Sequence, residues 1–598
     1  MSRPRPLLLA LWAGLAAGTG EALLLGLQRH LLHRLIFLSN DFWWMAPLGE
    51  AVLFLPLGLV LEVATRRLTP EGRWSLSLLA LTTLAGFALL QMYPPLHWLA
   101  GLVIAAGVGL QLSRWLGGAP QWFLRTIPAS AVLLVLLGLG AGIVPRLLAG
   151  MRLRREAAAQ PAARDGAPNV LVILLDTVRA MSLSLYGYQR DTSPRLSRWA
   201  AQGVTFERTI APAPWTLPSH ASLFTGRWPH QLGLDWHVGL AVGPPTLAEA
   251  FAAQGYRTAG FVGNTTYCSE ETGLSRGFAH WEAYPVSPAM ILKSAALGRL
   301  LAGTVLFQRL THGEQPLARR HAPVISGGLL QWLERPSARP YFAFLNYFDA
   351  HAPYLPPPGW SGRFGPEDNR RTLDLEPGWP YTPAEVESHH NAYDASLAYL
   401  DDQIGQLLDS LERRGALRNT IVVITADHGE EFGEHGFMDH GNTLYRPSVQ
   451  IPLIIRYPGH LPAGTRVAVP VSLRNLAATL VDMAGINGAT FPGRSLARTW
   501  SVPESLSAAT PDTILSEVNF TPGLPENYPV SHGRLRALVE SGLRYIRNAD
   551  SSAELYDFDG DAGETHNLAP ADPQSTARLG NSLDRITADR VEPGATRP

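Results

Sequence analysis

Five long apolar runs near the start of the chain constrain its folding more than any other feature. They lie near residues 6 to 27, 43 to 64, 75 to 93, 97 to 113 and 129 to 147. Each is close to the roughly 20 residues that a helix needs to cross the hydrocarbon core of a bilayer. A cleaved signal peptide would show one such run followed by a small-residue cleavage site. We therefore predict a transmembrane domain of about five helices over residues 1–148.

Charged residues are rare in these runs, and the acidic exceptions are Glu21, Glu50 and Glu62. A carboxylate inside a membrane invites a functional hypothesis, but Glu50 and Glu62 are near the ends of their runs, and we assign no role to any of the three. Five crossings place the two termini on opposite sides of the membrane. The arginines of the loops are divided almost equally between those sides, so the positive-inside rule does not select an orientation.

The overall composition excludes several classes of protein. The net charge of −1 gives no reason to expect a nucleic-acid partner. Cys268 is the only cysteine, which rules out an intrachain disulfide and a multi-cysteine metal site. Lys293 is the only lysine, so arginine supplies nearly all of the positive charge. This bias suggests a GC-rich bacterial genome.

A charged stretch rich in Ala and Pro, residues 149–167, has the composition of an interdomain linker. Beyond it the pattern changes to short apolar runs that end in polar or turn residues, as expected for strands buried on both faces of a parallel sheet. Helical candidates lie between them, near 193–203, 245–255 and 383–414. The alternation predicts an α/β sandwich with a central, mostly parallel sheet. The five candidate strands are residues 169–176, 257–264, 341–349, 419–427 and 451–459.

We predict a catalytic domain over 168–500, a C-terminal subdomain that completes its fold over 501–575, and a disordered tail over 576–598. Three candidate strands end in aspartate, namely Asp176, Asp349 and Asp427. Ligands bind at the carboxyl ends of the strands in open α/β sheets. One such aspartate alone would suggest a helix cap or a turn, whereas three together favour a site.

The segment ITADHGEEFGEHGFMDHG, residues 424–441, carries the strongest chemical signal. Asp427 and His428 follow a strand directly and offer one oxygen and one nitrogen ligand, a combination suited to Zn or Mn and possible for Mg or Ca through the carboxylate. A second segment, APAPWTLPSHASLFTG, places Thr216 at or just before the start of a short helix. A helix N-terminus favours a bound oxyanion, and a hydroxyl on a divalent metal there can attack phosphorus or sulfur. Taken alone, Thr216 would be a helix cap.

These segments resemble the sulfatase family of the alkaline phosphatase superfamily. The family's nucleophile pattern of Cys or Ser, any residue, Pro, Ser, Arg and a later Thr-Gly is similar to Thr216, Leu217, Pro218, Ser219, His220, Thr225 and Gly226. ILLDTVR resembles the first metal strand, YFDAHAPYLPP the His-x-Pro-Tyr substrate segment, and ADHGEEFGEHG the second metal segment. AYDASLAYLDDQIGQLLDSLE and ELYDFDGDAGETHNLA resemble the long helix and the closing segment. The motifs keep the family order from about residue 168 to 568.

The resemblance implies an alkaline-phosphatase-like sandwich and a role for each matching residue. Asp176, Asp427 and His428 match metal ligands, and Thr216 matches the nucleophile that also contacts the metal. His351 and His440 match substrate-side positions, where an imidazole can protonate a leaving group. Two further residues complete the predicted site: Asp349, which would orient a neighbouring histidine, and Arg227, which would hold an anionic oxygen. The expected cofactor is one divalent ion, Mn, Zn, Ca or Mg.

The chain departs from the sulfatase pattern at several positions. Well-studied sulfatases convert the nucleophilic Cys or Ser to formylglycine, and threonine is not a substrate for that conversion. No lysine stands where the family holds the sulfate, Thr177 replaces a second metal carboxylate, and Arg446 stands where Glu is common. A Thr nucleophile with an Asp-His pair behind transmembrane helices resembles lipoteichoic acid synthases and lipid phosphoethanolamine transferases, which usually carry Glu at the position of Asp176.

The leading hypothesis is a metal-dependent hydrolase of sulfate or phosphate esters that forms a covalent intermediate on Thr216. A transferase that takes a phosphoryl head group from a membrane lipid is one alternative, and an inactive membrane pseudoenzyme is a second. Expected substrates are a sulfated or phosphorylated small molecule, a glycan or a lipid head group. We expect an integral protein of a bacterial inner membrane whose catalytic domain is extracytoplasmic.

Overall fold

The computed structural model describes most of the chain and divides it into two compact units. Unit 1 consists of Met1–Ala159 and Tyr284–Ala318, and unit 2 consists of Gln160–Ala283 and Arg319–Pro598. The described residues are 4–32, 34–93, 95–117, 121–304, 319–367, 380–501, 512–521 and 523–588.

Unit 1 contains five helices that are long and apolar enough to cross a membrane, as the sequence predicts. They are α1 (Pro6–His30), α2 (Phe42–Ala64), α3 (Pro70–Leu90), α4 (Trp98–Gly117) and α5 (Gln121–Ala159). Helix α5 does not stop where the predicted linker starts at residue 149. It continues through Ala159 because MRLRREAAA consists of residues with high helix propensity.

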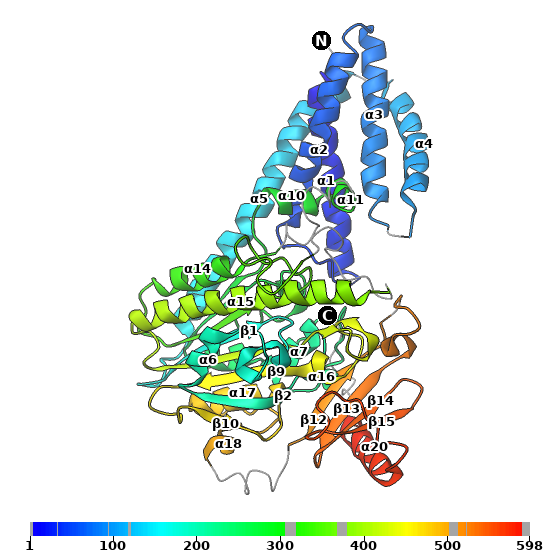
Figure 1. Cartoon of the computed structure of the whole chain (residues 1–598). Coiled ribbons are helices and arrows are strands. Elements are labelled where there is room, and N and C mark those ends of the chain that lie inside the picture. The colour runs from blue at the N-terminus through cyan, green and yellow to red at the C-terminus, as the bar shows by residue number, and fades with distance from the viewer. Residues whose placement is uncertain are drawn as a thin grey trace. The chain divides into compact units, whose positions relative to one another are not determined.

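Two short helices from the middle of the chain belong to unit 1. They are α10 (Pro288–Ser294) and α11 (Ala296–Ala302), and both pack against α2 (Figure 1). The sequence placed this segment inside the catalytic domain 168–500, so the domain is interrupted there. Gly49 of α2 makes the close approach possible, because a Cβ at that position would lie 2.5 Å from the Ile291 carbonyl oxygen.

Two carboxylates within the bundle find partners on this inserted segment. The Glu21 side chain is 1% exposed and its Oε1 lies 2.5 Å from Arg299 Nη2. The Glu50 side chain is fully buried and its Oε1 accepts the Leu297 N–H at 3.0 Å. Buried charges are tolerated when they are paired and hydrogen-bonded. The insertion therefore supplies a cation for Glu21 and a backbone N–H donor for Glu50.

Unit 2 is built on a nine-stranded, mostly parallel sheet with the order β10-β2-β9-β6-β1-β5-β3-β4, in which β11 also pairs with β2. All five predicted strands are present. Strand β9 runs antiparallel to both of its neighbours, β2 and β6. The strands are β1 (Asn169–Leu175), β2 (Val204–Ile210), β3 (Arg257–Val262), β4 (His280–Glu282), β5 (Tyr341–Tyr347), β6 (Thr420–Ala426), β9 (Gln450–Arg456), β10 (Thr465–Val467) and β11 (Val471–Ser472).

Helices in two groups enclose this sheet and make unit 2 an α/β sandwich. The first group is α6 (Pro194–Ala200), α14 (Ala322–Leu333) and α15 (Pro383–Arg413). The second group is α7 (Thr216–Thr225), α9 (Leu247–Ala253) and α17 (Leu476–Met483). Every residue of β5 and β6 is buried, which explains why their sequences are almost entirely apolar. Shorter elements are α8 (Pro229–Leu232), β7 (Glu431–Phe432), β8 (Met438–Asp439), α16 (Arg446–Val449) and α18 (Ala497–Ser501).

A four-stranded antiparallel sheet and one helix close the chain (Figure 1). Helix α20 contradicts the predicted disordered tail as far as Thr587, whereas residues 589–598 of that tail lie outside the described residues. Asp572 caps this helix, and Leu579 and Leu583, one turn apart, are buried in the core of the small sheet. The elements are β12 (Ile514–Val518), β13 (Leu535–Glu540), β14 (Leu543–Arg547), β15 (Ala553–Asp557) and α20 (Pro573–Thr587).

Replacing Arg299 should destabilise unit 1 more than replacing its partner Glu21. Arg299→Gln leaves a buried carboxylate without its counter-charge, at a cost of about 3 kcal/mol. Glu21→Gln leaves an arginine whose side chain is already 32% exposed and can turn to solvent. Thermal unfolding of the detergent-solubilised protein should show the larger decrease in Tm for Arg299→Gln. The decrease in Tm of the double variant should be smaller than the sum of the two single decreases. Strictly additive decreases would contradict an interaction between Arg299 and Glu21.

Candidate functional site

Two aspartates meet at the carboxyl ends of neighbouring strands. Strands β1 and β6 are parallel, and their register pairs Leu175 with Ala426, so the next residues, Asp176 and Asp427, lie side by side. Both carboxylates are completely buried. The Thr177 and His428 N–H groups donate to Asp427 Oδ1 at 3.1 and 2.9 Å. The backbone around the strand ends therefore holds this carboxylate in a fixed position.

The second oxygen of Asp427 has no hydrogen-bond donor in the described part of the chain. It lies 3.3 Å from His428 Nε2. His428 Nδ1 is 3.0 Å from the Gly429 carbonyl oxygen and donates to it, which leaves Nε2 as the unprotonated nitrogen. Asp176, Asp427 and His428 each offer one ligand atom, and these atoms lie within 4.8 Å of one another. The donors suit a divalent cation that accepts both oxygen and nitrogen ligands.

The pKa values of these groups show the effect of burying like charges together. Burial raises the pKa of Asp176 to about 7, and the charge of Asp427 adds to this effect. Burial likewise raises the pKa of Asp427 to about 7. Burial lowers the pKa of His428 to about 3, so the imidazole is neutral. A cation would compensate two buried carboxylates that otherwise repel each other. The donor set and its charge therefore fit the metal that the sequence predicts.

Thr216 is the first residue of α7 and is only 2% exposed. Its hydroxyl oxygen lies 3.4 Å from His428 Nε2. Because the first N–H groups of a helix have no partner within the helix, a negative oxygen is stabilised at this end. The structure thus brings the predicted nucleophile and the three predicted metal ligands together.

Two more histidines lie next to this group. The His440 ring is stacked 4.5 Å from the ring of His428, and the His351 ring lies 5.0 Å from His440. His440 Nδ1 is 3.0 Å from Glu430 Oε1 and 2.9 Å from Asp439 Oδ1. Burial acts to lower the pKa of His440, but these two carboxylates outweigh burial and raise the pKa well above its usual value. The pKa of His351 is lowered, mainly by burial.

Comparisons with known proteins agree with this geometry. The family model for sulfatases matches residues 168–486, more than half of the 598 residues. The chain belongs to the sulfatase family. It is 26% identical over 442 residues to the uncharacterized sulfatase YidJ of Escherichia coli, covering 67% of this chain and 83% of the relative.

Solved structures of the same fold include enzymes for two kinds of ester. A phosphonate monoester hydrolase of Agrobacterium radiobacter superposes with a TM-score of 0.55 and 21% identity, over 70% of this chain and 95% of its own. BT4656, solved in complex with its substrate D-glucosamine-2-N,6-O-disulfate, superposes with a TM-score of 0.57 and 19% identity, over 72% of this chain and 100% of its own. This sulfatase-family protein is therefore an ester hydrolase by family, with the α/β fold of these neighbours.

Two predicted residues of the sulfatase-like site make no contact with Asp176, Asp427 or His428 in the described part of the chain. Arg227 follows the C-terminus of α7, whereas Thr216 begins it, and a helix of this length separates its ends by about 15 Å. Asp349 Oδ1 accepts the Ala322 N–H at 3.2 Å and lies 3.3 Å from His321 Nδ1, at the start of α14. We therefore leave Arg227 out of the site. The histidine next to Asp349 is His321, not His428 of the potential metal-binding group.

Sequence reasoning missed the side chains that hold the predicted ligands. The amides of Asn264 and Asn346 donate to Asp176 Oδ2 at 3.0 and 3.1 Å. His220 donates to the Thr216 carbonyl oxygen at 2.8 Å, and burial lowers its pKa to about 3. Asn346 could have been found, because an amide inside the apolar strand YFAFLNY needs a buried partner.

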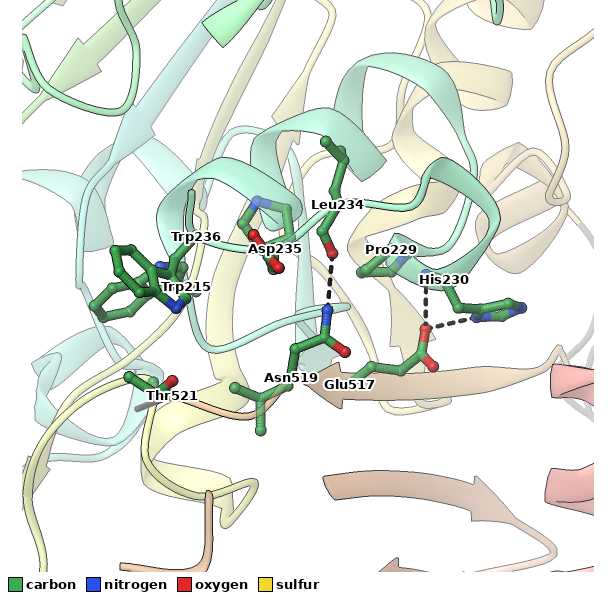
Figure 2. A pocket seen from close by; sticks show the side chains of 12 residues that line it. Trp215, Pro229, His230, Leu234, Asp235, Trp236, Glu517, Asn519 and Thr521 are labelled. Atoms are coloured by element: carbon green, nitrogen blue, oxygen red, sulfur yellow. Dashed lines mark hydrogen bonds and ion pairs between the residues drawn. The ribbon is translucent and has the colours of Figure 1, made fainter. Parts of the chain in front are cut away.

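A small pocket lies beside the start of the nucleophile helix. Trp215, which precedes Thr216, and Gly441, which follows His440, both contribute to its lining. Trp236 also lines the pocket, and Figure 2 shows Asn519 hydrogen-bonded to the Leu234 carbonyl and Glu517 bonded to His230. The C-terminal sheet thus contributes to the neighbourhood of Thr216 through Glu517 and the loop that follows β12.

Removing one carboxylate from the group should abolish metal binding. Asp427→Asn keeps the hydrogen bonds at Oδ1 but removes the charge that a cation needs. After incubation with Mn²⁺ or Zn²⁺ and dialysis, elemental analysis should give about one equivalent for the parent protein and at least about tenfold less for the variant. Asp349→Asn is the matched control, because this buried aspartate lies outside the group. Equal loss of metal from both variants would contradict the assignment.

Proposed function

We propose that this protein is a membrane-anchored hydrolase that cleaves a sulfate or phosphate ester with the Thr216 hydroxyl as nucleophile. The observation that carries the proposal is the position of that hydroxyl. It is buried at the N-terminus of α7 and lies 3.4 Å from His428 Nε2, which forms a potential metal-binding group with Asp176 and Asp427. A hydroxyl in this position lies beside residues that could hold a metal ion, and a bound ion would ease its ionisation. It also lies at a helix N-terminus, which stabilises an oxyanion.

One divalent ion, Mn, Zn, Ca or Mg, would be held by Asp176, Asp427, His428 and the Thr216 hydroxyl. When bound, it would ease ionisation of that hydroxyl and offset charge on the ester oxygens. Asn264 and Asn346 would keep the Asp176 carboxylate in position through their hydrogen bonds to Oδ2. His220 would fix the first turn of α7 through its bond to the Thr216 carbonyl.

The reaction would proceed in two displacements. In the first, Thr216 Oγ1 forms a bond to sulfur or phosphorus while the bond to the leaving-group oxygen breaks, and that oxygen takes up a proton. In the second, water attacks the same atom, sulfate or phosphate is released, and Thr216 regains its proton. The threonine hydroxyl is regenerated at the end of each cycle, so the proposed cycle does not require formylglycine.

His440 is the better donor of the proton to the leaving group, and His351 the better base for water. The Nδ1 of His440 lies against two carboxylates, which stabilise its charged form and leave Nε2 free to donate. His351 Nδ1 is 2.7 Å from the Ala352 carbonyl oxygen and donates to it, which leaves its Nε2 as an acceptor. The two rings lie close enough to serve one substrate in turn.

The substrate would be a sulfated or phosphorylated small molecule, a glycan or a lipid head group. Structural neighbours act on a disulfated glucosamine and on phosphonate monoesters, which supports this range. The five long apolar helices support an integral membrane protein. By analogy with the membrane-bound transferases, we propose a bacterial inner membrane with the catalytic domain on its extracytoplasmic side.

A second candidate is transfer rather than hydrolysis. The specific observation that favours it is the presence of five candidate membrane spans in the same chain as a threonine nucleophile. A lipid would then donate its phosphoryl head group to Thr216, and an acceptor hydroxyl would replace water in the second displacement. Release of diacylglycerol beyond the first turnover only when an acceptor alcohol is present would favour this candidate over hydrolysis.

Thr216→Ala should reduce turnover by about a thousandfold or more, because the covalent step loses its nucleophile. Thr216→Ser should keep activity within about tenfold, since the hydroxyl remains. We would measure nitrophenol release from an aryl sulfate and from a bis-aryl phosphodiester, with Mn²⁺ or Zn²⁺ present and thermal unfolding as the check of folding. Turnover of either ester that is unaffected by Thr216→Ala would exclude Thr216. No turnover of any ester by the parent would favour the pseudoenzyme.

The effect of His440→Gln on kcat/KM should depend on the leaving group of the ester. An alkyl ester needs protonation of its leaving oxygen, whereas p-nitrophenolate leaves without it. We therefore expect kcat/KM to decrease by about a hundredfold or more for an alkyl ester and by much less for the p-nitrophenyl ester. Asp349→Asn serves again as the control outside the site. Equal decreases for the two esters would show that His440 does not donate this proton.

A further inference from the structure

An apolar groove runs between three helices of unit 1. It has a volume of about 260 Å³. This volume is slightly below the range of roughly 300 to 1,000 Å³ that is typical of small-ligand sites. Helices α1, α2 and α5 contact one another along their lengths and form its walls. Its lining is almost entirely apolar apart from one residue at its end, Arg146. In a membrane, an opening of this kind is filled by a hydrocarbon chain.

The groove stays open where α5 carries a glycine. A Cβ added at Gly138 would meet nothing within 4 Å, although Gly138 lines the groove. Four residues further on, a Cβ at Gly142 would lie 3.2 Å from the Trp44 ring. The lining therefore has free space beside Gly138 and is in close contact with Trp44 at Gly142. We expect a larger side chain at Gly138 to take up part of the groove.

A cation and an anion lie side by side at the Trp44 end. Arg146 Nη2 is 2.8 Å from Asp41 Oδ2, and their side chains are 52% and 22% exposed. Trp44 Nε1 donates to Asp41 Oδ1 at 2.9 Å, and Asp41 immediately precedes the first residue of α2. Tryptophan at a helix end is typical of the membrane interface. The polar end of the groove is thus placed where a lipid head group would be.

We propose that this groove binds one glycerophospholipid with a zwitterionic phosphoethanolamine head group. One acyl chain would occupy the groove at Gly138, the phosphate would contact the N–H groups that Arg146 still has free, and the ammonium would contact Asp41. A head group that carries only negative charge is less complementary to Asp41 and Arg146, because Asp41 would repel an anion bound to Arg146. A sterol would offer a charged partner to neither Arg146 nor Asp41. The proposal does not depend on the catalytic function, because none of these residues belongs to the proposed site.

The experiment measures lipid retained by the full-length chain. The protein is stripped of lipid in detergent, incubated with dioleoyl phosphatidylethanolamine or dioleoyl phosphatidylglycerol, and analysed by native mass spectrometry. The parent protein should bind one phosphatidylethanolamine, in preference to phosphatidylglycerol. Gly138→Leu should reduce the bound fraction at least about fivefold. Gly140→Leu is the matched control, because Gly140 is equally open on the same helix but does not line the groove.

A second arm tests the head group. Asp41→Asn removes the anion and leaves Arg146, so the preference should change from phosphatidylethanolamine to phosphatidylglycerol. An unchanged ratio would overturn the assignment of the head group. Equal retention by the Gly138→Leu and Gly140→Leu variants, or preference of the parent for phosphatidylglycerol, would overturn the site. If Gly138→Leu fails to fold by gel filtration, the Asp41→Asn ratio still decides the proposal.

Discussion

The parallel register of β1 and β6 is the constraint on which the rest of the catalytic unit depends. It places Asp176 and Asp427 at the same edge of the sheet, where both are completely buried. Two adjacent buried carboxylates are unfavourable by themselves. Backbone N–H groups donate to Asp427 and two asparagine amides donate to Asp176, which compensates part of their charge. One oxygen of Asp427 has no donor among the described residues. The remaining negative charge is the reason that we propose a cation site at this edge rather than a structural cluster.

The sequence predicted the elements with the most regular patterns and missed those without one. The five strand predictions succeeded because each strand is buried and nearly continuous in apolar residues. Strand β2 was missed because VTFERTI places Glu207 and Arg208 in its middle, where the ladder to β9 shifts register. The α10 and α11 helices were missed because each has only seven residues, too few to show a membrane span or a periodic face. Their position depends on long-range partners such as Glu21 and Glu50, which no local pattern reveals.

The candidate site shows the same division between local and long-range information. Asp427 and His428 are adjacent in the sequence, so their common role could be predicted from the sequence alone. The support of Asp176 by Asn264 and Asn346 comes from two other strands and required the sheet order. Arg227 shows the opposite error, because nearness in sequence suggested nearness in space. It lies eleven positions after Thr216, and the intervening helix directs the two residues to opposite ends of α7.

The burial of Thr216 bears on why a threonine can stand where related enzymes use another nucleophile. Its side chain is 2% exposed and the whole of α7 is buried, so water is largely excluded from the hydroxyl. In such surroundings an ionised oxygen needs compensating charge, and the N-terminus of α7 together with a cation on Asp176, Asp427 and His428 would provide it. A hydroxyl that depends on these neighbours does not need the chemical modification that activates cysteine or serine in other members of the family. The departure at this position is therefore compatible with the proposed reaction, in which Thr216 would depend on a bound cation.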